Sequence, residues 1–375
     1  MNETDIEVAK TQPQRHIFYK AYEQPVEHLT IARLDPLHCD NEMAELPAWN
    51  KKEDVNAIVR AITTIAPPTD VAEAFSMQEA RAALRDLGML MASVRKHGPE
   101  PETLVPQVVQ TMLLLGTRAD MVPRETIMHY AAWNPDGERQ RCFTHHRDEV
   151  KIIQGTKIAI PGLERAVLGL AELYTIPLDS PDFASYARFV HINMSAMVRS
   201  IVFTIVNVNP RVFATDLRPY YDPFTLAGTE YMGAGAVQLP LFVFDHILWS
   251  SDSLDSVFNK FKEHNIPYCT RVLRTIYSHF SGRASLVRKV CHEIRTVRVP
   301  SIHLLQSVQA LNDLLDVLVR FRTTHKSLAN RAFSHREDTA LGSGGYRPTI
   351  LEHILDLTLE AKHDLKNALR LDDSR

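Results

Sequence analysis

The sequence predicts an all-α protein, and three observations support this. Apolar residues recur at steps of three and four through much of the 375-residue chain, which is the spacing of a buried helix face. Helix-start signals are present, such as Ser76 followed by Glu79. The alternation of apolar and polar residues that is typical of strands is scarce. We therefore expect helices packed on helices, with little sheet.

Composition and charge exclude several classes of protein. The net charge of −3 and the absence of a basic patch argue against a nucleic-acid partner. Four cysteines lie far apart without a Cys-x-x-Cys pair, which argues against a disulfide framework, a zinc ribbon and covalently attached haem. The amino terminus is polar and no run of eighteen apolar residues occurs, so neither a secretory signal nor a membrane span is expected. We expect a cytoplasmic protein.

The first 135 residues are expected to form an irregular lead-in and then a small helical domain. Four prolines interrupt residues 1–50, so little regular structure is expected before Asp54. Residues 51–135 form the small domain, with helices predicted over about 52–65, from Ser76 towards Gly98, and from Pro101 to Ala119. A polar, turn-rich break over residues 134–147 predicts the domain boundary.

Residues 136–375 are expected to form a large helical domain that binds a ligand. A short helix should begin at Asn209-Pro210, and Pro219 prevents its continuation. The apolar spacing predicts the other helices over about 148–173, 183–206, 237–249, 253–264, 268–280, 284–293 and 301–333, and from Pro348 onwards.

The longest predicted helix carries a histidine within its apolar face. That face consists of Leu311, Leu314, Leu318, Phe321, His325, Leu328 and Ala332. Neutral imidazole is a common iron ligand, and haem needs an enclosing apolar surface. We therefore consider His325 a candidate haem ligand, with Arg322, one turn earlier, as a partner for a propionate. A lone histidine on such a face is more often an ordinary core residue, so the pattern alone leaves both interpretations open.

Three further features could contribute to a site. Gly342-Ser343-Gly344-Gly345 lies in a long loop after a helix; it lacks the context of a phosphate-binding loop and indicates either a lid or a flexible segment. Arg218 could hold a carboxylate beside aromatic residues, or only stabilise a helix end. His145-His146 has no metal-ligand spacing, and adjacent histidines in a polar segment are usually exposed.

Taken together, these segments resemble the indoleamine and tryptophan 2,3-dioxygenase superfamily. The segment from Arg322 to His325, with the loop Gly342-Ser-Gly-Gly345, resembles its proximal-histidine helix and Gly-Thr-Gly-Gly loop. The segment Val208–Arg218 resembles the one that carries a substrate-stacking Phe and a carboxylate-binding Arg, and Gly233-Ala-Gly-Ala-Val-Gln falls at the position of its small-residue distal loop.

A closer resemblance is to the monodechloroaminopyrrolnitrin synthase family of pyrrolnitrin biosynthesis, and it runs from about Arg81 to the end of the chain. The matching motifs occur in one order: Arg85-Asp-Leu-Gly, Pro123-Arg-Glu-Thr, Trp133-Asn-Pro, Leu217-Arg-Pro-Tyr-Tyr, Pro240-Leu-Phe-Val, Phe280-Ser-Gly and Gly342-Ser-Gly-Gly-Tyr346. The first fifty or so residues match poorly.

The resemblance implies an indoleamine 2,3-dioxygenase-like helical fold that binds haem b, with His325 as the axial metal ligand. It also implies that Arg218 grips the substrate carboxylate and that Phe213 lines the indole pocket. Ser343 and Gly344 would contact the amino-acid head group, with Ser343 as a catalytic residue. Phe333 stands where this family has a tyrosine eight residues after the histidine. His145 has no matched counterpart and is expected to add an acid or base.

The expected function is therefore haem-dependent oxidation of the indole of tryptophan or a halogenated tryptophan. We expect the ring rearrangement to an aminophenylpyrrole, with dioxygen or peroxide and an external reductant as co-reactants. Two alternatives stay open: a 2,3-dioxygenase that gives N-formylkynurenine, and a non-catalytic haem sensor or carrier. A helical interaction scaffold without haem is a third alternative.

Overall fold

The computed structural model describes residues 24–335, 341–342 and 344–370, and it confirms the all-α fold. Most of the predicted helices are present within a few residues of their expected bounds. The α-helices are α2 (Gln24–Arg33), α3 (Asp40–Lys52), α4 (Val55–Ile65), α5 (Thr69–Ala74), α6 (Met77–Lys96), α7 (Pro101–Leu104), α8 (Pro106–Ala119), α9 (Arg147–Leu173), α10 (Pro181–Asn207), α11 (Pro210–Val212), α12 (Leu241–Asp245), α13 (Ser256–Asn265), α14 (Arg271–Phe280), α15 (Leu286–Thr296), α16 (Ile302–Phe333) and α17 (Thr349–Arg370).

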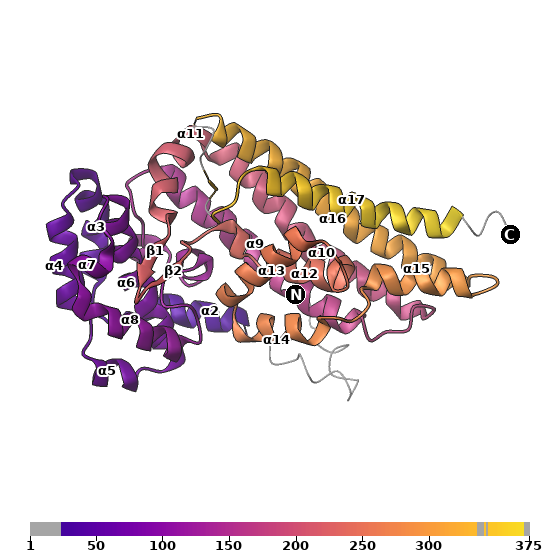
Figure 1. The fold of residues 1–375 in the computed structure, drawn as a ribbon, viewed down its shortest axis with the longest axis horizontal. Helices are drawn as coiled ribbons and strands as arrows, with labels where there is room; N and C mark the ends of the chain where they lie inside the picture. Colours follow the sequence, from indigo (N-terminus) through magenta and orange to yellow (C-terminus); the bar gives the residue numbers. More distant parts are fainter. Residues whose placement is uncertain (1–23, 336–340, 343, 371–375) are drawn as a thin grey trace.

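The helices fall into two groups along the long axis of the molecule. Figure 1 shows α3 to α8 gathered at one end, whereas the long helices α9, α10, α16 and α17 extend towards the other. Helix α10 packs along both α9 and α16, and α17 packs along α16. Buried apolar side chains from both groups form one continuous cluster, from Ile31 to Ala368. The two groups therefore share a core, and the domain boundary near residue 135 stays a prediction.

Two helix-boundary predictions have different outcomes. The Ser76 hydroxyl accepts a hydrogen bond from the Glu79 amide and the Glu79 carboxylate accepts one from the Ser76 amide, which confirms the capping box. The single helix predicted from Pro101 to Ala119 is wrong, because the chain breaks at Val105 between α7 and α8. Pro106 disfavours helical geometry at the preceding residue, and Val105 adopts φ −132° and ψ 55°.

The prediction of little regular structure before Asp54 is wrong for residues 24–52, which form α2 and α3. Pro25 lies in the first turn of α2, where the missing amide proton removes no helical hydrogen bond. Pro36 lies in the turn between the two helices, and Pro47 is buried inside α3. Of these three prolines, one starts a helix, one lies in a turn and one is accommodated inside a continuous helix.

A small hairpin was also missed. Strands β1 (Phe224–Leu226) and β2 (Thr229–Tyr231) pair antiparallel, with Leu226 opposite Thr229. The turn between them places Ala227 and Gly228 at φ 49° and 76°, the left-handed conformation that two-residue hairpin turns need. Strands of three residues are too short for an alternating pattern to be recognised.

Helix α10 alone among the described helices has the length and apolar composition to cross a membrane. In this fold it approaches α9 closely, through positions where α9 carries glycine. A Cβ added at Gly162 would lie 2.4 Å from the Cβ of Ala196, and one added at Gly155 would lie 2.7 Å from the Thr204 hydroxyl. The apolar character of α10 is therefore used in part for tight helix packing.

Candidate functional site

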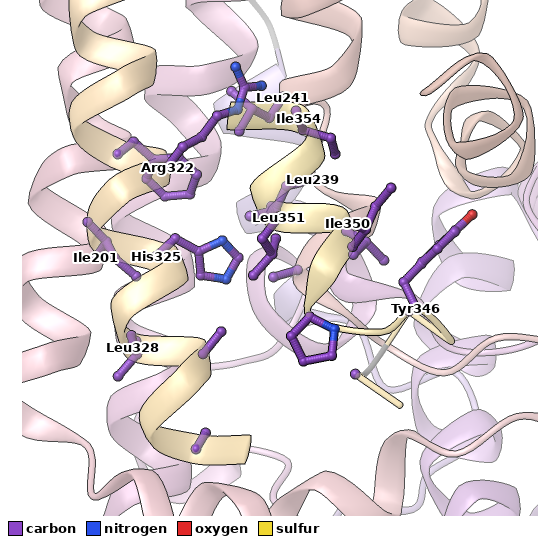
Figure 2. Close-up of a pocket in the computed structure, with 18 of the residues that line it drawn as sticks. Ile201, Leu239, Leu241, Arg322, His325, Leu328, Tyr346, Ile350, Leu351 and Ile354 are labelled. Carbon is purple, nitrogen blue, oxygen red and sulfur yellow. The ribbon is translucent and has the colours of Figure 1, made fainter. Parts of the chain in front are cut away.

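A cavity of about 290 Å³ lies between α10, α12, α16 and α17, beside the glycine loop. Three segments far apart in the sequence border it, namely the turn at Phe213–Leu217, the end of α16, and the loop residues Gly342, Gly344 and Tyr346 to Pro348. Its walls are mainly aliphatic, and Figure 2 shows these side chains around the central space: Ile201, Leu239, Leu241, Leu328, Ile350, Leu351 and Ile354. Such a space suits a large, mostly apolar ligand.

His325 projects from α16 into this cavity, as Figure 2 shows. The preceding residues of the predicted apolar face, from Leu311 to Phe321, are buried, whereas His325 is partly accessible because it borders the cavity. Burial, and next the charge of Arg322, lower the pKa of His325 to about 4. The imidazole is therefore neutral near pH 7 and carries a lone pair that a metal ion can accept.

Arg322 also lines the cavity, but its guanidinium contacts other protein groups. It forms a buried ion pair with Asp245 at the end of α12 and donates a hydrogen bond to the Thr358 hydroxyl on α17. Asp245 also accepts a hydrogen bond from the Trp249 indole at 3.0 Å. These contacts join three helices around the cavity, so a propionate contact to Arg322 would have to share the guanidinium with Asp245.

Arg218 lines the cavity from a different segment of the chain. Its guanidinium is nearly buried; Nη1 lies 2.6 Å from Oδ1 of Asp222, and Nη2 donates to the carbonyl of Gly342 at 2.7 Å. The residue lies where a π-helical turn, Phe213–Leu217, gives way to a 3₁₀ turn, Arg218–Tyr221. Such irregular turns recur at functional sites. Here the hydrogen bond from Arg218 to the Gly342 carbonyl joins the turn to the glycine loop.

The other predicted substrate contacts that the structure describes line the same cavity. Phe213, Phe333 and Gly344 line it. A Cβ added at Gly344 would lie 2.2 Å from Cγ2 of Val237, so only glycine fits against that side chain. Ser343, predicted as a catalytic and head-group contact, lies outside the described residues.

The comparison with known protein families now bears on this geometry. A family model described as monodechloroaminopyrrolnitrin synthase PrnB matches residues 10–373. The chain belongs to this family. The PrnB match begins well before Arg81, so the expectation that the first fifty residues match poorly is wrong from residue 10 onwards. Helices α2 and α3 are thus part of the PrnB-family region, and the chain is a member of a family of enzymes.

His145 does not belong to the cavity of this PrnB-family chain. It lies exposed on the loop before α9 and is not among the residues that line the cavity. Its neighbour His146 is also exposed, with Nε2 3.4 Å from Asp216. The sequence offered a polar, turn-rich segment here, and such segments lie at the surface. The geometry therefore gives no support to His145 as an acid or base at this site.

Two site residues were missed by sequence reasoning. Asp222, the partner of Arg218, follows it by four residues, and this spacing of opposite charges was a usable signal. Asp245, the partner of Arg322, precedes it by 77 residues, so no local pattern connects them. Long-range ion pairs of this kind require the fold.

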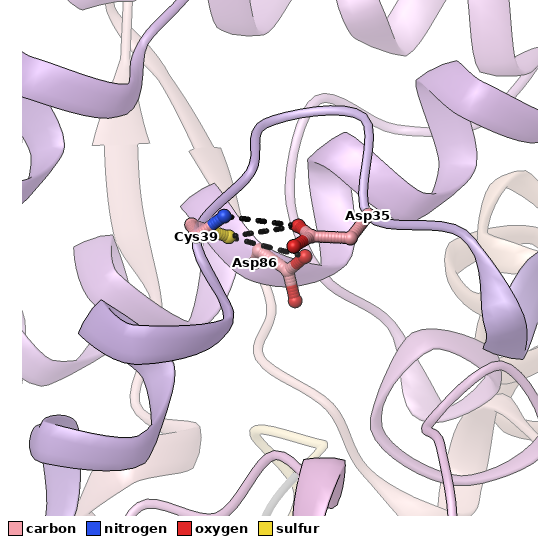
Figure 3. Close-up of side chains that lie close together, drawn as sticks. All are labelled: Asp35, Cys39 and Asp86. Atoms are coloured by element: carbon pink, nitrogen blue, oxygen red, sulfur yellow. Dashed lines mark hydrogen bonds between the residues drawn. The ribbon is translucent and has the colours of Figure 1, made fainter.

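A second polar cluster, formed by Asp35, Cys39 and Asp86, lies between the α2–α3 turn and α6 (Figure 3). The Cys39 thiol lies 3.5 Å from a carboxylate oxygen of each aspartate, and its pKa is strongly raised, first by burial and then by Asp86. Asp86 is bound by two buried guanidinium groups, those of Arg85 at 2.8 Å and Arg141 at 3.1 Å. Protein cations thus occupy the carboxylates, and the cluster fixes the α2–α3 turn on α6.

Proposed function

We propose that the chain is a haem b-dependent enzyme that acts on the indole of tryptophan or a halogenated tryptophan and rearranges it to an aminophenylpyrrole. One observation carries this proposal: the neutral imidazole of His325 enters an apolar cavity that Arg218 borders from another segment. Membership of the PrnB family supports the same class of substrate.

The residues present fit haem b by the chemistry of their side chains. An imidazole with a lowered pKa would be a suitable ligand for the haem iron, and the aliphatic walls would suit the macrocycle. Gly344 packs against Val237 without room for a Cβ, so the loop can approach that wall of the cavity closely. A bound haem would supply the activation of dioxygen or peroxide, with electrons from an external reductant.

The chain itself binds, orients and shields the substrate. We assign the carboxylate of the amino acid to Arg218, because a nearly buried guanidinium binds a carboxylate through charge-assisted hydrogen bonds. Phe213 and Phe333 line the same cavity and provide aromatic surface for the indole. The aliphatic walls exclude water from the reacting ring, and fixed binding contacts supply orientation.

The test is the absorption spectrum of the purified protein beside the variant His325→Ala. We expect a Soret band in the wild type and loss of most haem, or a changed ferrous–CO spectrum, in the variant. His303→Ala is the matched control, because His303 lies on the same helix but not on the cavity. Unchanged haem content and spectrum in His325→Ala would contradict the proposal, and kynurenine formed from tryptophan would contradict the rearrangement.

A further inference from the structure

The guanidinium of Arg218 already holds a carboxylate that belongs to the protein. Nη1 contacts Asp222 at 2.6 Å, and Nη2 contacts the Gly342 carbonyl at 2.7 Å. The two partners differ in exposure, since the Arg218 side chain is 5 % exposed and that of Asp222 is 42 % exposed. The proposed ligand carboxylate and Asp222 would therefore need the same cation.

We propose that Asp222 is a specificity-determining residue, whose carboxylate occupies the position on Arg218 that a substrate carboxylate takes on binding. This inference rests on the function proposed above, in which Arg218 binds the substrate carboxylate. Asp222 then competes with the substrate carboxylate for Arg218, and only a ligand that carries a carboxylate replaces it at low cost.

The contacts around the pair allow Asp222 to leave while Arg218 stays. The Asp222 backbone is fixed, because its carbonyl accepts a hydrogen bond from Arg124 at 3.3 Å and its amide donates to Pro219 at 3.4 Å. Rotation of the side chain alone therefore releases the carboxylate, which is already partly in water. Arg218 remains attached to the Gly342 carbonyl throughout the exchange.

The exchange discriminates between ligands by charge. Removing the Asp222 carboxylate takes negative charge away from a nearly buried guanidinium, so Arg218 favours an occupant that restores that charge. A ligand with a carboxylate replaces Asp222 like for like. An indole amine without a carboxylate leaves the Arg218–Asp222 pair intact and gains no contact with Arg218.

The variant Asp222→Asn tests the inference, because it removes the competing charge and keeps the shape. Isothermal titration of the holoprotein would use L-tryptophan, indole-3-propionate and tryptamine as probes. We expect the variant to bind the two carboxylates about fivefold more tightly, the upper range for a partly exposed ion pair. Tryptamine affinity should not change.

Two controls separate competition from general effects. Asp222→Glu keeps the negative charge and should bind all three probes as the wild type does. Asp216→Asn removes a carboxylate that lies on the same segment, is also 42 % exposed and pairs with the exposed His146. It should leave the three affinities unchanged, because Asp216 does not contact Arg218.

Other results have distinct meanings. Weaker or unchanged carboxylate binding by Asp222→Asn would overturn the inference; weaker binding would show that Asp222 only positions Arg218. Arg218→Gln tests the underlying assignment separately. If Arg218→Gln leaves tryptophan affinity unchanged, the carboxylate assignment itself fails and Asp222 loses its role. If Arg218→Gln abolishes tryptophan binding but Asp222→Asn does not tighten it, only the inference about Asp222 fails.

Discussion

The cavity around His325 and the cluster around Asp86 both place ionisable side chains inside the protein, but the two regions complete their interactions differently. Asp86 is fully buried and receives hydrogen bonds from Arg85 and Arg141. His325 borders an apolar space and, within the described part of the chain, its closest aromatic neighbour is Phe321 at 5.5 Å between ring centroids. The first region is complete without a ligand, whereas the second has an imidazole directed at a space of ligand size.

This difference separates structural polar groups from binding groups more reliably than residue type does. A carboxylate cluster beside a cysteine has the composition of a metal site, yet the guanidinium groups neutralise it. A lone histidine on an apolar helix has the composition of a core, yet it faces a cavity. Partners, and not composition, decide which region supports the fold and which binds a ligand.

The largest expected effect belongs to the neutralised cluster, through the variant Asp86→Asn. The change leaves the buried Arg85 and Arg141 without their shared charge, which should lower the free energy of unfolding by about 3–5 kcal/mol. Urea denaturation followed by circular dichroism measures this loss. Under the proposed function, the haem content of the folded fraction should not change, because the cluster does not border the cavity.

Asp40→Asn is the matched control for that prediction. Asp40 pairs with the same Arg141 at 2.5 Å but is 41 % exposed, so its loss should cost less than about 1 kcal/mol. Equal losses from the two variants would show that burial does not set the importance of these carboxylates.

Glu149 sharpens the comparison, because it is fully buried among hydrogen-bond donors, and no cation from the described residues contacts it. It accepts from the Phe143 amide at 2.6 Å, the Thr144 amide at 2.7 Å and the Tyr130 hydroxyl at 3.2 Å. Burial raises the pKa of Glu149 from 4.5 to about 7 despite these donors. The folded state thus holds a proton between these values that the unfolded state releases.

Stability from Glu149 should therefore be complete below pH 4.5 and decline as the pH rises to about 7, by about 3 kcal/mol. Unfolding measured at intervals over this range should show the decline in the wild type and lose it in Glu149→Gln. Glu79 is a control of opposite sign. Its hydrogen bonds with Ser76 lower the pKa of Glu79, so its contribution to the free energy of unfolding should be lost only as the pH falls below 4.5. The same slope in Glu149→Gln would contradict the assignment to Glu149.

The sequence predicted most of the helices because their signals are local. The stripe from Leu311 to Phe321, the capping box at Ser76 and the start at Asn209-Pro210 each depend on residues within a few turns. Errors arose where a local signal has two meanings, as with the prolines that start or join helices before residue 54, and where a segment is too short to give a signal, as with the two strands.

The site was predictable to the extent that single residues reveal it. His325, Arg218, Phe213, Phe333 and Gly344 line one cavity, and their selection depended on motif resemblance more than on periodicity. The pairing of Arg322 with Asp245 was not predictable, because it joins helices distant in sequence. His145 shows the opposite error. Its residue type suggested an acid or base, whereas in the fold it lies exposed at the surface, away from the cavity.

The smallest expected effect concerns the wall of the cavity, through Gly344→Ala. An alanine Cβ would lie 2.2 Å from Cγ2 of Val237. The shifts needed to remove such a clash destabilise the folded state by about 1–3 kcal/mol. Because residue 344 borders the cavity, the loop should move and tryptophan affinity should fall, as measured by titration. The second change Val237→Ala removes the opposing methyl groups and should restore affinity in the double variant. Without such restoration the clash would not explain the loss, and the requirement for glycine would have to come from the backbone or from direct contact with the ligand.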